Sequence, residues 1–425
     1  MANQKQDGGS TVFGIDLWMT IGAFALAVLM LVLATQVHAQ TLTVLHNFTG
    51  GADGSYPIGG FTMDRAGNLY GSAEGGGSQN CAGGCGVIFK LTHKGSGWTF
   101  NPLYEFLGAP TGETPYAPPT FGPDGALYGT TVSGGSAGGG TVFRLAPSPN
   151  ACKTALCPWI ETLPYQFTGG KDGAIPVSAV AFDQAGNLYA TTAGDGGGNC
   201  YGGCGTIYEL KPSNGGWSGA VVHTFQGPPK DGAGPNSMIF DDAGDILGTT
   251  LAGGAYDEGT IFELIPSGSG WTEKVLYSFQ HAGDGSQPDG AMISDEVGNL
   301  YGTTSDSEWN TGGTVFEMSP ANGGWTLATI YNFSGNGGPR ASLTLDAAGD
   351  LYGTTYADGA YGHGSVFKLT PGTGGWAYTS LCDFKGDRDG QNPVSNVVFD
   401  SVGNLYGTTY RGGQYYQGMV FEITP

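Results

Sequence analysis

Four segments in the second half of the chain combine aromatic side chains with carboxylates, and these residues are the best suited to bind a ligand. An aromatic ring can stack on a sugar ring while a carboxylate accepts hydrogen bonds from the sugar hydroxyls. The same aromatic residues can anchor a protein partner, or they can simply cover the edges of strands. The candidate ligand-binding residues are Tyr256, Asp257, Trp309, Tyr356, Tyr361, His363, Tyr410 and Tyr415.

A second group of acidic residues stands four positions ahead of prolines, each within an Asp-Gly pair. Ca²⁺ is bound by about six to eight oxygen ligands, so carboxylates repeated in this way could hold it. An Asp-Gly pair also favours a tight turn, which explains the pattern without a metal. Calcium is therefore the one cofactor that the sequence leaves open, at Asp53, Asp172, Asp231, Asp284 and Asp389.

Two histidines, His281 and His363, break the repeat pattern of the chain and could act as general bases beside Asp284 or Glu308. The sequence has no nucleophile elbow, phosphate-binding loop or His-rich zinc motif. We therefore assign no catalytic residue, cofactor-binding residue or metal ligand. A binding protein is favoured, with a structural protein of the cell envelope and a metal-dependent lyase or lactonase as alternatives.

Six of the seven cysteines lie in closely spaced pairs, which favours local disulfides formed in an oxidising compartment. A zinc site is the alternative, but it would need four converging ligands, and the two matching pairs are not in neighbouring repeats. Cys382 occupies a strand position held elsewhere by tyrosine or histidine, so we expect a buried free thiol. The expected disulfides are Cys81–Cys85, Cys152–Cys157 and Cys200–Cys204.

The elements that must position these residues come from a unit repeated seven times from Thr41 onward. Its clearest marker is a short apolar strand ending in paired threonines, as in Leu300–Thr304, and successive copies are 51 to 61 residues apart. This is the length of a propeller blade or of a short solenoid unit. The copies begin at Leu69, Leu127, Leu188, Ile246, Leu300, Leu351 and Leu405.

Each unit contains four strand signals that are short, rich in β-branched and aromatic residues, and bounded by Gly, Pro and Asp. Such segments are typical of half-buried antiparallel strands. The first two strands are joined by Asp-x-x-Gly turns, in which the aspartate is expected to cap the turn backbone. The chain holds 80 glycines, which suits a fold with many tight turns.

The two ends of the repeat region hold complementary strands. The region begins with a fourth strand, Thr41–Phe48, and ends after a third strand, Met419–Thr424. Pairing them would complete one blade and remove the exposed edges of an open array. The sequence therefore predicts an all-β, seven-bladed propeller with four antiparallel strands per blade over residues 40–425, and a linear β-solenoid is the alternative.

The N-terminal segment, residues 1–39, has the features of a signal peptide, with an apolar run at Ile21–Ala34 followed by Val37-His38-Ala39. Extended back to Leu17, the same run is long enough for an uncleaved membrane anchor, so residues 17–35 would be the only membrane contact. We expect a secreted, periplasmic or cell-surface protein. The net charge of −21 repels phosphate backbones, which excludes nucleic acid as a partner, and we expect a monomer.

The refrain Asp-x-x-Gly-Asn-Leu-Tyr-Gly-Thr-Thr, followed by a Gly-rich loop and Gly-x-Val-Phe-x-Leu, resembles the GloVer tandem-repeat family of bacterial exported proteins. The resemblance runs through all seven units, from about Thr41 to Pro425. It implies a secreted or surface repeat protein with no assigned biochemical activity.

Overall fold

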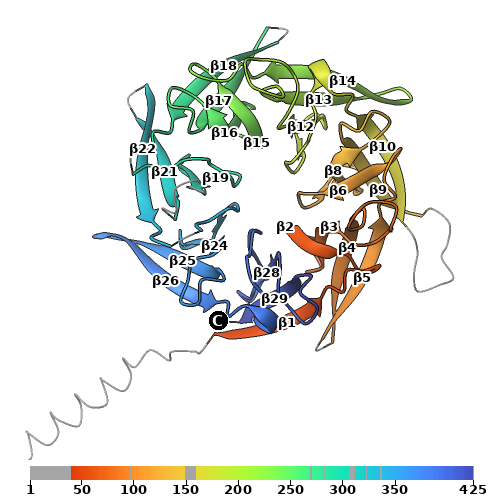
Figure 1. Ribbon diagram of the computed structural model, residues 1–425. Coiled ribbons are helices and arrows are strands. Elements are labelled where there is room, and N and C mark those ends of the chain that lie inside the picture. Colours follow the sequence, from red (N-terminus) through yellow and green to blue (C-terminus); the bar gives the residue numbers. More distant parts are fainter. Residues whose placement is uncertain are drawn as a thin grey trace, which may run out of the picture. The chain divides into compact units, whose positions relative to one another are not determined.

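The computed structural model describes residues 40–95, 97–148, 159–268, 270–281, 283–305, 312–321, 323–335 and 337–424. Residues Thr41–Thr424 form one compact unit, in which seven antiparallel sheets surround a central axis (Figure 1). The predicted all-β propeller is confirmed, and the solenoid alternative is wrong. The expected signal or anchor segment, residues 1–39, lies outside the described residues.

The blades are numbered in chain order, and the first strand of each is the innermost (Figure 1). Blade 1 contains β2 (Ser55–Met63), β3 (Leu69–Gly75), β4 (Val87–Lys94) and β5 (Gly97–Glu105). Blade 2 contains β6 (Gly112–Pro115), β7 (Thr120–Phe121), β8 (Leu127–Gly134), β9 (Thr141–Pro147) and β10 (Trp159–Gln166). Blade 3 contains β11 (Ala181–Phe182), β12 (Leu188–Thr192), β13 (Thr206–Ser213) and β14 (Gly216–Thr224).

The remaining blades follow the same order. Blade 4 contains β15 (Gly232–Phe240), β16 (Ile246–Gly253), β17 (Thr260–Ser267) and β18 (Gly270–Ser278). Blade 5 contains β19 (Ile293–Ser294), β20 (Leu300–Thr304), β21 (Thr314–Ala321) and β22 (Gly324–Asn332). Blade 6 contains β23 (Thr344–Leu345), β24 (Leu351–Thr355), β25 (Ser365–Gly372) and β26 (Gly375–Asp383). Blade 7 contains β27 (Val398–Phe399), β28 (Leu405–Thr409), β29 (Met419–Thr424) and β1 (Thr41–Asn47).

The ring is closed by the two ends of the repeat region, as predicted. Strand β1 pairs antiparallel with β29, with Thr41 opposite Thr424 and Asn47 opposite Met419. The order of this sheet is β1-β29-β28-β27, so the first strand in the chain is the outermost strand of blade 7. The hydroxyl of Thr408 in blade 7 also donates a hydrogen bond of 3.3 Å to the carbonyl of Pro57 in blade 1.

The paired threonines of the repeat have two different tasks. In blade 5 the first hydroxyl, on Thr303, donates to the carbonyl of Ala341 in blade 6 at 3.1 Å. The second, on Thr304, lies 2.9 Å from the hydroxyl of Thr314 on the neighbouring strand of its own blade. Both threonines are almost fully buried, so these bonds satisfy polar groups that would otherwise be costly to bury. In blade 5 the first threonine thus links two blades, and the second links two strands. Blade 4 differs, because the Thr249 hydroxyl donates to Asn236 of its own blade at 2.9 Å.

The glycine before the threonines makes room for the phenylalanine of the third strand. A Cβ atom at Gly302 would lie 2.4 Å from the ring of Phe316, which is fully buried. Blade 3 departs from this pairing, since Ala190 stands opposite Tyr208. The repeated Leu-Tyr-Gly-Thr-Thr sequence is therefore explained by packing and hydrogen bonding. We call the buried positions that recur from blade to blade in this way the framework.

The aspartate turns between the first two strands are structural, as expected. The Asp64 carboxylate accepts hydrogen bonds from the backbone N–H groups of Ala66 and Asn68, both at 2.9 Å, and from the Tyr70 hydroxyl at 3.1 Å. Asp124 of blade 2 accepts the equivalent bonds from Ala126 and Tyr128, although its turn has a different sequence.

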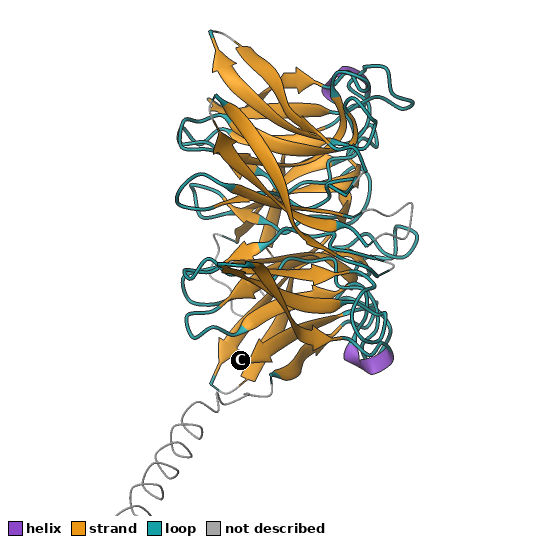
Figure 2. Cartoon of the chain, turned by 90° about the vertical axis from the view of Figure 1, so that its left-hand side faces the viewer, coloured by secondary structure: helices purple, strands orange, loops and turns teal. Residues whose placement is uncertain are grey.

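The loops between the second and third strands share one face of the propeller with the connections between blades. We call this side the loop face, and in Figure 2 it also carries the two short 3₁₀ helices, η1 (Gly170–Asp172) and η2 (Asp387–Asp389). A direct contact between the two kinds of loop is the hydrogen bond of 2.7 Å from Gly77 N–H to the Gly51 carbonyl.

Two of the three predicted disulfides are confirmed, Cys81–Cys85 and Cys200–Cys204, with Cα separations of 5.1 and 5.2 Å. Cys152 and Cys157 lie outside the described residues. Cys382 is a free thiol, but it is half-buried instead of fully buried, because it lies on β26, an outermost strand. Burial and the neighbouring aspartates raise its pKa to about 11. Among the described residues, no helix has the length and apolar character to cross a membrane.

Candidate functional site in the central channel

A cavity of about 490 Å³ lies on the propeller axis, and all seven blades contribute to its wall. In every blade, one proline lies within the innermost strand or five residues ahead of it, and the residue directly after that proline lines this cavity. A second lining position follows the paired threonines or their equivalents and is occupied by Glu74, Ala193, Leu251, Tyr356 and Tyr410. The residues at the first position are Ile58, Tyr116, Val177, Asn236, Asp289, Arg340 and Val394.

The second lining position lies in or directly after the second strand of its blade, and the backbone just before the first lining position is under local strain. The residue before the proline often has a positive φ even where it is not glycine, as at Tyr56 (56°), Thr114 (60°) and Asn392 (56°). This conformation costs about 1–3 kcal/mol for such residues. Each of these N–H groups donates to a carbonyl of the preceding blade, for example Tyr56 to Gln417 at 2.8 Å. The contact between blades therefore holds the strained turn from which the lining residue projects.

An acid, an amide and a guanidinium from consecutive blades meet on one side of the cavity. The side chain of Asn236 donates to the carbonyls of Pro288 and Asp289, both at 2.9 Å. Burial raises the pKa of Asp289 to about 6, although the charge of Arg340 and a hydrogen bond with Asn236 act in the opposite direction. The Arg340 guanidinium lies 4.3 Å from the centre of the Tyr356 ring, a cation–π contact. Its Nε atom is buried and has no hydrogen-bond partner within the described chain.

A second acid lies on the blade 1 side of the cavity. The Tyr410 hydroxyl donates to the Glu74 carboxylate at 2.6 Å. Burial raises the pKa of Glu74, while Tyr410 and the charge of Arg411 oppose that shift. Tyr410 also packs against Tyr56, with ring centres 5.3 Å apart. Glu74 is therefore a fixed, partly desolvated acceptor at the wall.

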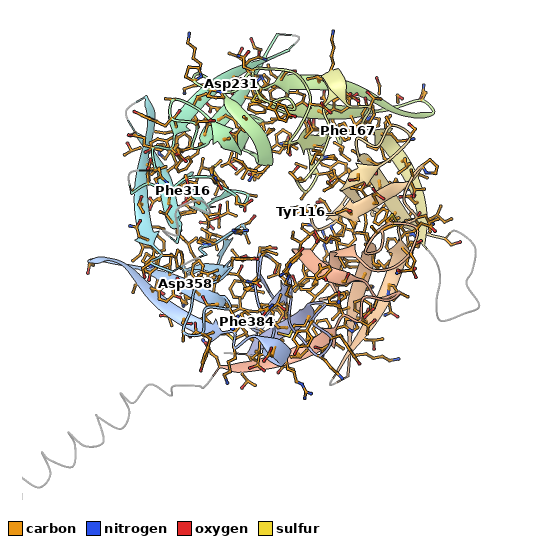
Figure 3. The ribbon with its side chains drawn as sticks, viewed as in Figure 1. Tyr116, Phe167, Asp231, Phe316, Asp358 and Phe384 are labelled. Carbon is orange, nitrogen blue, oxygen red and sulfur yellow. A yellow bond between two sulfur atoms is a disulfide. The ribbon has the colours of Figure 1, made fainter. Side chains whose placement is uncertain are left out.

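Tyr116 extends from blade 2 toward the axis, where Figure 3 labels it in the centre of the ring. Its side chain is 39% exposed. Burial raises the pKa of Tyr116 to about 12, the charges of Asp289 and Glu74 act in the same direction, and Arg340 opposes them. The Tyr116 hydroxyl therefore interacts electrostatically with charged residues of blades 1, 5 and 6. The cavity is a single site in which groups from distant parts of the chain interact.

The structure divides the predicted ligand-binding residues into two groups. Tyr356 and Tyr410 line the cavity. Tyr256, Tyr361 and Tyr415 are 57%, 54% and 48% exposed and lie on separate loops of blades 4, 6 and 7. The Asp257 carboxylate accepts a hydrogen bond from Gly253 N–H within its own loop, and His363 lies against Gly386 of the next connection. Trp309 is outside the described residues.

The aspartates considered for calcium are engaged in their own turns. Asp172 accepts hydrogen bonds from Tyr165 at 3.0 Å and from the Thr168 backbone at 2.8 Å, and Asp284 accepts one from Tyr277 at 2.8 Å. His281 lies 3.4 Å from the Ser286 hydroxyl. Glu308, which the sequence suggested together with Asp284 as an acid beside a catalytic histidine, is outside the described residues. Calcium binding stays an untested prediction.

Among the polar lining residues that escaped the sequence analysis, five occupy the two variable positions: Glu74, Tyr116, Asn236, Asp289 and Arg340. A signal for them was present. The prolines recur in register, yet the residue after each proline changes from apolar to aromatic, amide, acid or base. Variation beside an invariant framework position marks a side chain that the fold does not dictate.

The chain belongs to the Gloeobacter/Verrucomicrobia repeat family, whose model matches residues 31–237, 158–338 and 235–425. No curated protein matches the chain. Among solved structures, it is similar to a candidate oxidoreductase (glucose dehydrogenase) from Thermus thermophilus, with 15% identity and a TM-score of 0.41. That match covers 91% of this chain and all of the other.

Proposed function

We propose that the protein is an exported, non-catalytic binding propeller that takes an uncharged carbohydrate in the mouth of its central channel. One observation carries this proposal: three tyrosines and four hydrogen-bonding side chains converge on the axial cavity at the positions where the repeat varies. These residues are Glu74, Tyr116, Asn236, Asp289, Arg340, Tyr356 and Tyr410.

The chemistry of the cavity suits a sugar better than an ion. A sugar hydroxyl both donates and accepts hydrogen bonds, and the wall offers acceptors on Glu74 and Asp289 and donors on Arg340. Tyrosine rings supply apolar surface for the face of a sugar ring. The acids are balanced by Arg340 and by Arg411 beside Glu74, which favours an uncharged ligand. A volume of about 490 Å³ is in the usual range for small-molecule sites.

Export is supported by the two disulfides, Cys81–Cys85 and Cys200–Cys204, because such bonds persist in oxidising compartments. The hydrophobic run at Ile21–Ala34 is the corresponding targeting signal in the sequence. Export would place the cavity in contact with extracellular or envelope glycans.

A glycan array probed with the purified protein, with and without Ca²⁺, tests the ligand class and the calcium prediction together. For a glycan that binds, calorimetric titration should show that Tyr116→Ala lowers affinity about tenfold or more, as expected for a central aromatic anchor. Val177→Ala, at the equivalent position of blade 3, is the matched control and should change affinity far less. Failure to bind any glycan, or equal effects of the two substitutions, would contradict the proposal.

A further inference from the structure

Three side chains of the types that bind metals meet at the junction of blades 3 and 4. His223 lies on β14, Glu273 lies on β18, and Asp231 lies in the connection between β14 and β15. Their ligating atoms are all within 4.8 Å of one another. Strands β14 and β18 are the outermost strands of neighbouring blades, and Figure 3 shows Asp231 far from Tyr116 at the axis (Figures 1 and 3). This cluster is therefore separate from the channel.

The two distances from the histidine to the acids are longer than an ordinary hydrogen bond but suit a shared metal ion. His223 Nε2 lies 3.4 Å from Glu273 Oε2 and 3.7 Å from Asp231 Oδ2. An N–H···O hydrogen bond spans about 2.7–3.2 Å. Zinc binds nitrogen and oxygen ligands at about 2.0–2.2 Å, so the ligands of a tetrahedral zinc ion are about 3.3–3.6 Å apart.

Two atoms of the cluster are buried and unsatisfied. Within the described chain, neither His223 Nε2 nor Glu273 Oε1 has a hydrogen-bond partner. The side chains of His223, Asp231 and Glu273 are only 18%, 9% and 16% exposed. Buried polar atoms without a partner are costly, and a bound cation would satisfy both.

The ligands are also held in place by the fold. The two Asp231 carboxylate oxygens accept hydrogen bonds from the backbone N–H groups of Gln226 and Gly232, each at 2.6 Å. The His223 ring packs edge-to-face on Phe225, with ring centres 4.6 Å apart. Oriented ligands of this kind are typical of metal sites whose ligands are supported by surrounding hydrogen bonds and packing.

The equivalent positions at other junctions show what is unusual here. His46 makes a hydrogen bond of 3.0 Å with Asp53, and the ring of Phe100 stacks on it at 3.8 Å. Tyr277 donates to Asp284 at 2.8 Å. In both junctions the donor satisfies one acid. At the junction of blades 3 and 4, a histidine faces two acids, and a good hydrogen bond to either is missing.

We propose that His223, Asp231 and Glu273 bind a divalent transition-metal ion such as Zn²⁺, with a fourth position open to water. An imidazole nitrogen favours zinc over calcium, which would need more oxygen ligands. The ion would connect the outermost strands of two blades and their connecting loop. It would therefore stabilise the folded propeller at a junction that lies outside the ligand channel.

The experiment measures Zn²⁺ binding to the purified, metal-stripped protein by calorimetric titration and its effect on the melting temperature. His223→Tyr introduces the residue that blades 1, 2, 4 and 5 carry at this position (Tyr104, Tyr165, Tyr277 and Tyr331), so this variant should fold. We expect it to weaken Zn²⁺ binding more than about 100-fold, because changes to the residues that merely support the ligands cost about 10–100-fold. The rise in melting temperature caused by Zn²⁺ should disappear with it.

His46→Tyr is the matched control, since it changes the equivalent histidine, which faces one acid only; it should leave Zn²⁺ binding unchanged. If His223→Tyr does not fold, Glu273→Gln, which preserves side-chain volume, decides the question by the same loss of binding. The proposal is overturned if the wild-type protein binds no Zn²⁺, if His223→Tyr and Glu273→Gln bind it normally, or if His46→Tyr loses it equally.

Discussion

Blades 6 and 7 each carry two tyrosines five residues apart in the same loop, and the two members of each pair have different surroundings. Tyr356 and Tyr410 follow the paired threonines and line the axial cavity. Tyr361 and Tyr415 stand farther along the loops, where they are 54% and 48% exposed. Residue type alone makes these tyrosines equivalent. What separates them is their distance from the paired threonines, which belong to the sheet: Tyr356 and Tyr410 directly follow these threonines, whereas Tyr361 and Tyr415 lie five residues farther along the loops.

The same contrast holds between the framework and the cavity wall throughout the molecule. Thr409 and Pro339 are buried framework residues, whereas their neighbours Tyr410 and Arg340 face the axis. The framework residues are repeated because each has a fixed packing or hydrogen-bonding task. Their neighbours differ from blade to blade, so no packing or hydrogen-bonding task common to all blades dictates them.

The largest effect is expected in the framework. Phe316→Ala removes a fully buried ring that packs against Phe279, with ring centres 5.4 Å apart. The free energy of unfolding should fall by about 3–5 kcal/mol in urea denaturation, because the substitution leaves a cavity. Tyr116→Ala at the cavity wall should cost far less. An equal loss of stability would show that the wall belongs to the framework.

A smaller effect is expected from the hydrogen bonds between blades. Thr303→Val keeps the shape of the side chain but leaves the buried Ala341 carbonyl without the donor at 3.1 Å. The free energy of unfolding should fall by about 1–3 kcal/mol. If this variant unfolds at the same urea concentration as the wild type, the paired threonines do not link the blades as described.

A third stability effect concerns Asp289 and depends on pH. Its pKa is raised from the ordinary value of 3.8 to about 6 in the folded protein. The folded state therefore binds the proton more tightly than the unfolded state, and the free energy of unfolding should fall as pH rises from about 4 to about 6. Asp289→Asn removes this contribution. The variant should be close to the wild type at pH 4 and exceed its stability by about 2–3 kcal/mol at pH 8.

Melting curves of both proteins across this pH range provide the measurement. A stability difference that does not change with pH would mean that Asp289 titrates normally. In that case the Asp289 carboxyl would be more exposed to water than its position in the cavity wall indicates.

The sequence predicted the framework well, because each framework position recurs seven times and obeys simple packing rules. The two terminal strands and the aspartate turns followed from the repeat alone, and two cysteine pairs followed from their close spacing. The site was harder to predict because its residues are brought together by ring closure. Glu74 and Arg340 are 266 positions apart, and nothing local in the sequence shows that both face the axis. Tyr356 and Tyr410 could be predicted because they are aromatic residues in variable loops, whereas Asp289 lies directly after a proline of the repeat and outside those loops.

The most direct test of the account compares two double variants that change the same residue type in the same two blades. Affinity for a glycan identified on the array would be measured for Tyr356→Ala with Tyr410→Ala, and for Tyr361→Ala with Tyr415→Ala. We predict a loss of about tenfold or more for the first pair, which lines the cavity, and a change within about twofold for the second. Full affinity in the first pair with loss in the second would place the site on the outer loops and contradict the proposed role of the channel.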